Sequence, residues 1–137
     1  MHGKISKRKI TLVVVAVIVI IGIIVGLSIF NKYKRYHNQV NSMTFQDIDI
    51  SAIPDGVYIG ECDTGVIYAK VEVIVENGVL LNIQLLEHRH ERGETAEIII
   101  DHMMQEQRTD VDVVASATNS SKVIRKAVEN ALTGNNN

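Results

Sequence analysis

A run of 21 residues, from Ile10 to Phe30, contains no charged side chain and no proline, and 17 of its members are apolar. At about 1.5 Å per residue, a helix over this run is about 31 Å long, close to the thickness of a bilayer's hydrocarbon core of about 30 Å. A remaining domain of about 100 residues is too small to bury so long an apolar helix. The run therefore predicts a transmembrane anchor, and a chain of 137 residues leaves room beside it for one compact domain.

This run differs from a cleaved signal peptide, whose apolar region has about 7–15 residues and ends in a cleavage site of small residues. Here the run is longer and ends in Ile29-Phe30-Asn31-Lys32. We therefore expect an uncleaved anchor. Four basic residues precede the span and three follow it closely, so the positive-inside rule favours an inside amino terminus by a small margin.

Charge divides the chain into two parts of opposite sign. Residues 1–37 carry seven basic side chains and no carboxylate, whereas residues 38–137 carry the other seven basic and all 16 acidic side chains, a net charge of −9. A domain with this charge is a poor partner for nucleic acid, whose phosphates require basic residues. The single cysteine, Cys62, excludes a disulfide framework, and we expect it to be a small strand residue. We divide the chain into a basic tail (1–9), a transmembrane anchor (10–30), a stalk or linker (31–53), a globular domain (54–133) and a short tail (134–137).

The first half of the domain has the pattern of an antiparallel sheet. Strand signals cover 57–62, 66–75 and 79–87, with turn residues before and between them. For the second hairpin we expect a three-residue loop, 76–78, because it pairs Val73 with Leu81 and gives one fully apolar face. A two-residue Asn77-Gly78 turn with regular pairing would instead place Val73 opposite Asn82.

Two helices are expected to follow the strands. After a break at Gly93, apolar residues recur at helical spacing from Ala96 to about Gln107, and a second apolar stripe runs from about Asn119 to Leu132. Three strands followed by two helices predict an α+β fold: an antiparallel sheet with two helices packed on one face, preceded by one transmembrane helix.

Between the two helices lies a segment rich in hydroxyl side chains, from Asp112 to Ser121. Thr118 falls at the start of the last helix, where free backbone N–H groups and the helix dipole favour an anion such as phosphate. The same residue types also gather at helix starts because they cap them. The residues by themselves leave both interpretations open.

The segment Asp112-Val-Val-Ala-Ser-Ala-Thr118 resembles the flavinylation motif of FMN-binding domains, D-x-x-(S/T)-(G/S)-A-(T/S), of the type found in a subunit of the sodium-translocating and Rnf-type respiratory complexes. It departs from the motif at Ala115, where the family has Ser or Thr. The resemblance extends over roughly residues 55–133. Three further segments are similar to the family. Asp55–Gly60 resembles its opening D-G-x-Y-x-G, Glu76–Val79 resembles its hairpin, and His88–Gly93 resembles a segment of its small single-domain members.

This resemblance implies that the cofactor is FMN, joined by a phosphoester bond to the hydroxyl of Thr118. It implies that Asp112 helps a flavin transferase to recognise or activate that acceptor. The remaining residues expected to bind the cofactor are Ser116, Ala117, Asn119, Ser120 and Ser121. Because Ala115 lacks the usual hydroxyl, FMN held without a covalent bond stays an alternative.

The function expected from these features is that of a single-pass protein of the cell membrane whose extracytoplasmic domain carries FMN and transfers electrons to or from redox partners that the sequence does not identify. We expect an electron carrier rather than an enzyme with its own substrate pocket, and no catalytic residue is assigned. Two alternatives stay open: a non-redox binding or sensing module on the same fold, and a structural subunit whose Ser and Thr cluster only caps the last helix.

We expect no metal site. His88 and His90 lie on one side of the third strand if it extends that far, and Glu91 and His102 are possible further ligands. Against this, two adjacent arginines would repel a cation, and a polar strand end explains the pattern equally well.

Overall fold

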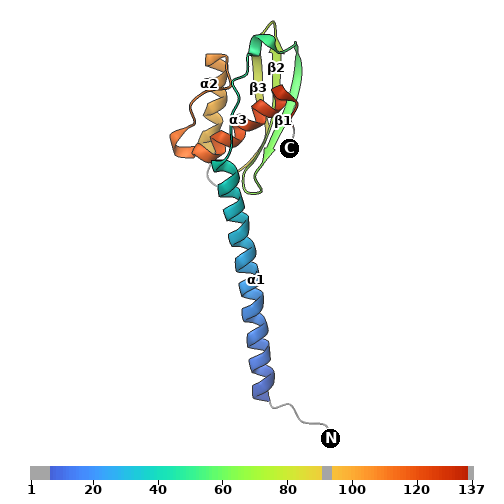
Figure 1. Ribbon diagram of the computed structural model, residues 1–137, viewed down its shortest axis with the longest axis vertical. Helices are drawn as coiled ribbons and strands as arrows, with labels where there is room; N and C mark the ends of the chain where they lie inside the picture. The colour runs from blue at the N-terminus through green and yellow to red at the C-terminus, as the bar shows by residue number, and fades with distance from the viewer. Residues whose placement is uncertain (1–6, 91–93, 136–137) are drawn as a thin grey trace. The chain divides into compact units, whose positions relative to one another are not determined.

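The computed structural model describes residues 7–90 and 94–135, which form two units that divide between Arg35 and Tyr36 (Figure 1). The first unit is most of helix α1 (Lys7–Asn41), and its apolar residues from Ile10 to Phe30 are exposed. The most apolar 18-residue window of α1 has a mean hydropathy of 3.3. By length and composition, α1 can cross a membrane, as the sequence predicts.

The second unit is an α+β domain, which confirms the predicted fold class (Figure 1). Its antiparallel sheet has the order β1-β2-β3 and is formed by β1 (Gly56–Asp63), β2 (Tyr68–Glu76) and β3 (Val79–Arg89). Helix α3 (Thr118–Thr133) packs against β1 and β2, and α2 (Ile98–Glu106) packs against β3. Three short 3₁₀ turns complete it: η1 (Ile50–Ala52), η2 (Glu94–Glu97) and η3 (Ala115–Ala117).

The turn of the second hairpin differs from the predicted one. Asn77 and Gly78 form a two-residue turn in which both have positive φ, 53° and 74°, the combination that a type I′ turn requires. Glu76 pairs directly with Val79 across this turn. The prediction of a three-residue loop is therefore wrong.

A bulge in β3 explains why the apolar face survives the shorter turn. Val75 pairs with Leu80, and the register then shifts so that Leu81 has no paired residue on β2. Beyond the shift, Val73 faces Ile83, and both side chains are buried. A second shift leaves Leu86 without a paired residue as well, so the apolar residues reach one face through two extra residues in β3 that regular pairing does not include.

The core lies between the sheet and α3. Alternate residues of β2, from Ala69 to Val75, are at most 1% exposed, because successive side chains of a strand point to opposite faces. Helix α3 covers them with buried apolar residues: Val123, Ile124, Ala127, Val128, Ala131 and Leu132. The segment 36–53 belongs to this unit and adds Tyr36, Val40 and Ile50 to the core.

Cys62 is a buried residue of β1. Burial raises the pKa of its thiol to about 11, and the nearby ammonium of Lys126 offsets only part of this effect. The thiol is therefore protonated at neutral pH, and Cys62 serves as a small residue in the strand.

Gly60 brings β1 and α3 into backbone contact. A Cβ atom built at this position would overlap with the carbonyl oxygen of Ala127 and with the backbone nitrogen of Ala131. Both obstacles are backbone atoms of α3, so a larger residue could be accommodated only by moving the helix away from the sheet.

We therefore expect Gly60→Ala to lower the free energy of unfolding by at least about 3 kcal/mol, because overpacking here displaces a whole helix. Gly56→Ala is the matched control in the same strand, since its Cβ would meet only the Tyr58 ring at ordinary contact distance, 3.4 Å. The chain has no tryptophan, so tyrosine fluorescence in detergent micelles can follow unfolding by denaturant. Equal stability of the two variants would contradict the proposed backbone contact.

Candidate functional site

The loop that carries the motif, residues 110–117, is attached to α3 by Arg125. The guanidinium of Arg125, which is 9% exposed, donates hydrogen bonds to Asp110 Oδ1 at 2.5 Å and to the carbonyl oxygen of Val111 at 3.3 Å. It also lies 4.2 Å from the centre of the Phe45 ring, a cation–π distance. These contacts hold the start of the loop against the middle of the helix.

Ser121 holds the other end of the loop. Its hydroxyl donates to the carbonyl oxygen of Ala117 at 2.9 Å and accepts from the backbone N–H of Val114 at 3.1 Å. The side chain is fully buried. Ser121, one of the residues expected to line a phosphate, therefore uses its hydroxyl to shape the loop.

Asn119 and Ser120, which are also predicted to bind the cofactor, are held by other parts of the unit or buried in it. The side-chain amide of Asn119 donates to the hydroxyl of Tyr36 at 2.9 Å, and Ser120 is 4% exposed. Both lie in the first turn of α3, and their placement connects this turn to the rest of the unit.

Thr118 is the first residue of α3 and is partly exposed. Its hydroxyl donates to the carbonyl oxygen of Ala115 at 3.4 Å, a long and therefore weak hydrogen bond. The N-cap position is occupied by Ala117, whose methyl group cannot accept a hydrogen bond from the helix. The Ser and Thr cluster thus does not place a hydroxyl at the cap position.

Three motif residues of the loop are exposed: Asp112, Ala115 and Ser116. The Ser116 hydroxyl lies 3.3 Å from the hydroxyl of Thr95 in η2. Thr95 in turn lines a groove of about 600 Å³, within the range of about 300–1,000 Å³ typical of small-molecule sites. The rest of the groove is lined by Leu85, Glu97, Ile98, Ile100 and Asp101.

Thr95 is not among the residues that the sequence predicts for the site. It precedes Ser116 by 21 residues, and nothing in its local pattern indicates contact with the motif. Only the packing of η2 against η3 brings the two hydroxyls together.

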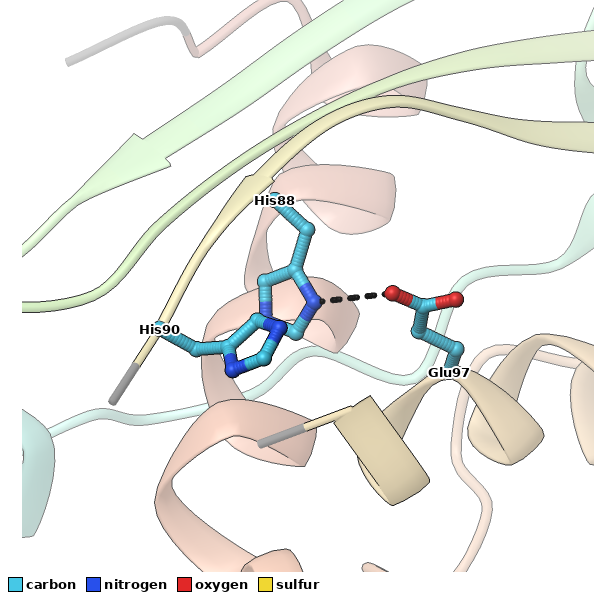
Figure 2. Close-up of side chains that lie close together, drawn as sticks. All are labelled: His88, His90 and Glu97. Carbon is cyan, nitrogen blue, oxygen red and sulfur yellow. Dashed lines mark hydrogen bonds and ion pairs between the residues drawn. The ribbon is translucent and has the colours of Figure 1, made fainter. Parts of the chain in front are cut away.

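A second group of polar side chains lies at the end of β3, where His88 and His90 point towards Glu97 of η2 (Figure 2). The Nδ1 atom of His88 is 3.2 Å from Glu97 Oε1, and the two imidazole rings are 4.4 Å apart between centres. The His88 side chain is 3% exposed, and its Nε2 atom has no hydrogen-bond partner within residues 7–90 and 94–135. Burial lowers the pKa of His88, and the hydrogen bond that its ring donates to the Glu97 carboxylate opposes this effect.

Arg89 points away from this group. Its guanidinium lies 3.5 Å from an oxygen of Asp63 and 5.4 Å from the centre of the Tyr68 ring. Glu91, named above as a further metal ligand, lies outside the described residues, as does Arg92, the second of the two arginines expected to repel a cation.

Comparison with known proteins identifies the class to which the second unit belongs. A family model described as an FMN-binding domain matches residues 64–133, half of the chain, and the chain belongs to this family. Its cofactor is FMN. No curated protein and no solved structure matches the chain.

The two hydrogen bonds of the Ser121 hydroxyl predict that Ser121→Ala lowers the free energy of unfolding by about 1–2 kcal/mol, because a loop amide and a carbonyl lose their partner. Ser116→Ala removes an exposed hydroxyl from the same loop and should change stability by less than about 0.5 kcal/mol. Denaturant unfolding followed by tyrosine fluorescence compares the two. A Ser121→Ala variant as stable as the Ser116→Ala variant would contradict this role for Ser121.

Proposed function

We propose that FMN is attached to the start of α3 by a phosphoester bond to the Thr118 hydroxyl. The observation that carries the proposal is the position of this hydroxyl, partly exposed at the first residue of a 16-residue helix and engaged only in a long hydrogen bond. The first turn contains Thr, Asn and two Ser, without a carboxylate that would compete with a phosphate. Backbone N–H groups and the helix dipole favour a dianion at this end.

The motif residues then divide into two roles. Asp112 and Ser116 are exposed, so Asp112 is accessible to a flavin transferase and Ser116 can donate a hydrogen bond to the phosphate. Ala117 contributes its backbone at the cap position. Asn119, Ser120 and Ser121 support the phosphate site from beneath, through the buried contacts of the first turn.

The groove beside Thr95 is the proposed position of the flavin ring. Thr95, which lines the groove, has its hydroxyl 3.3 Å from the hydroxyl of Ser116, and Ser116 precedes Thr118 by two residues. Ile98 is 47% exposed, and Leu85 and Ile100 are partly buried, so a planar ring that covered these three side chains would exclude water from one of its faces.

Electron transfer is the activity that we propose for this site. Bound FMN supplies the redox chemistry, while the protein binds it, orients it and sets its surroundings. Helix α1 would keep the domain at the membrane as a single-pass anchor, with the domain on the extracytoplasmic side and in reach of redox partners there. A covalent bond would prevent loss of the cofactor from an extracytoplasmic domain.

Mass spectrometry of the chain produced together with a flavin transferase tests the attachment. The wild-type chain should gain the mass of FMN minus water on a peptide that contains Thr118, and Thr118→Ala should gain none. The substitution removes only the weak hydrogen bond to Ala115, so the fold should persist. Ala115→Thr restores the family's hydroxyl at an exposed position and should be modified at least as completely as the wild type.

Thr133→Ala is the matched control, since it removes a threonine hydroxyl at the opposite end of α3 and should keep the modification. An unmodified wild type, or a Thr118→Ala variant modified as fully as the wild type, would refute the attachment site. The modified protein should also lose its yellow absorbance on addition of a reductant and regain it in air. A flavin that does not respond would favour the non-redox binding or sensing module.

Protease added to intact cells tests the orientation. We expect the second unit, residues 36–137, to be removed from the wild-type chain, because an inside amino terminus places it outside. A cytoplasmic protein in the same cells serves as the control for cell integrity. Full protection of the second unit, with digestion only after lysis, would show the opposite orientation.

A further inference from the structure

We propose that His88, His90 and Glu97 bind one divalent transition-metal ion of the zinc class. The site lies at the end of β3 and on η2 (Figure 2), and it shares Glu97 with the groove beside Thr95 but does not include Thr118. The inference revises the expectation from sequence that the chain has no metal site, and it does not depend on covalent attachment of the flavin.

The spacing of the three side chains suits a single ion. One ligand atom from each lies within 4.8 Å of the other two. At bond lengths of about 2.0–2.2 Å, two ligands of a tetrahedral ion are about 3.3–3.6 Å apart. The 3.2 Å between His88 Nδ1 and Glu97 Oε1 is already close to this value. Small rotations of the side chains would complete the arrangement.

The chemistry of the donors indicates the class of ion. Two imidazole nitrogens combined with one carboxylate oxygen suit Zn²⁺ better than Ca²⁺ or Mg²⁺, which prefer oxygen ligands alone. Three protein ligands leave a fourth tetrahedral position for water or another small ligand.

The surroundings of His88 suit a metal ligand. Its side chain is 3% exposed, and an ion bound to both Nδ1 and Glu97 Oε1 would take the place of their hydrogen bond. Coordination through Nδ1 leaves Nε2, which has no partner in the described part of the chain, to carry the ring proton. Burial also keeps the imidazole neutral, the form that binds metal.

The objection from neighbouring arginines is weaker in the structure than in the sequence. Arg89 follows His88 directly, but successive side chains of a strand point to opposite faces. Its guanidinium contacts Asp63 and the Tyr68 ring, so its charge is directed away from the imidazoles.

Calorimetric titration of Zn²⁺ into the full chain tests the proposal, with the protein in detergent and without a polyhistidine tag. A Thr118→Ala background removes the covalent flavin, so that the result does not depend on flavinylation. We expect one Zn²⁺ to bind per chain and the affinity to fall at least about tenfold in Glu97→Gln and in His90→Gln. Co²⁺ should give the visible absorption of a tetrahedral site, and Glu97→Gln should weaken it.

His102→Gln is the matched control, because His102 is a partly buried histidine of α2 outside this group of three. Its affinity for Zn²⁺ should equal that of the parent chain. His88→Gln should abolish binding, and if that variant does not fold, the Glu97→Gln and His90→Gln variants decide the question. No saturable binding of one Zn²⁺ by the parent chain, or equal affinity in Glu97→Gln, His90→Gln and His102→Gln, would overturn the proposal.

Discussion

The backbone contact of α3 with β1 at Gly60 is the constraint on which the position of the candidate site depends. Because this residue has no Cβ, the helix backbone at Ala127 and Ala131 can approach the strand directly. This contact sets the distance of the helix from the sheet, and the apolar stripe of α3 then determines its rotation. The start of the helix, where Thr118 lies, is placed by packing that occurs about two and a half to three and a half turns further along.

Polar contacts between α3 and the motif loop, residues 110–117, determine the conformation of the loop. Arg125 binds one end of the loop through Asp110 and Val111, and Ser121 binds the other end. Both residues are buried members of α3 whose polar atoms find partners in the loop, as buried polar groups generally must. The loop is therefore fixed by the same helix that carries Thr118, so stability of the domain and geometry of the proposed attachment site are coupled.

Much of the fold could be predicted because its signals are local. The apolar run, the strand patterns and the stripe of the last helix each depend on periodicity within one segment, and the order of elements predicts the α+β class. The register of the second hairpin could not be predicted in this way. The bulge at Leu81 changes which residues of β2 and β3 face each other. Because its neighbour Leu80 is also apolar, the pattern of apolar residues does not indicate where the bulge lies.

The sequence by itself determined an apolar helix long enough to cross a membrane, the α+β class, the FMN-binding family and Thr118 as the hydroxyl that ends the motif. The tertiary structure alone decided which residues of similar chemistry are buried and which are exposed. Ser121 is buried and contacts the loop, whereas Ser116 is exposed beside Thr95. It also decided that His88 meets Glu97, nine residues away. The physical reason is that composition and spacing specify what each side chain can bind, whereas the packing of helix on sheet determines which partners come within reach.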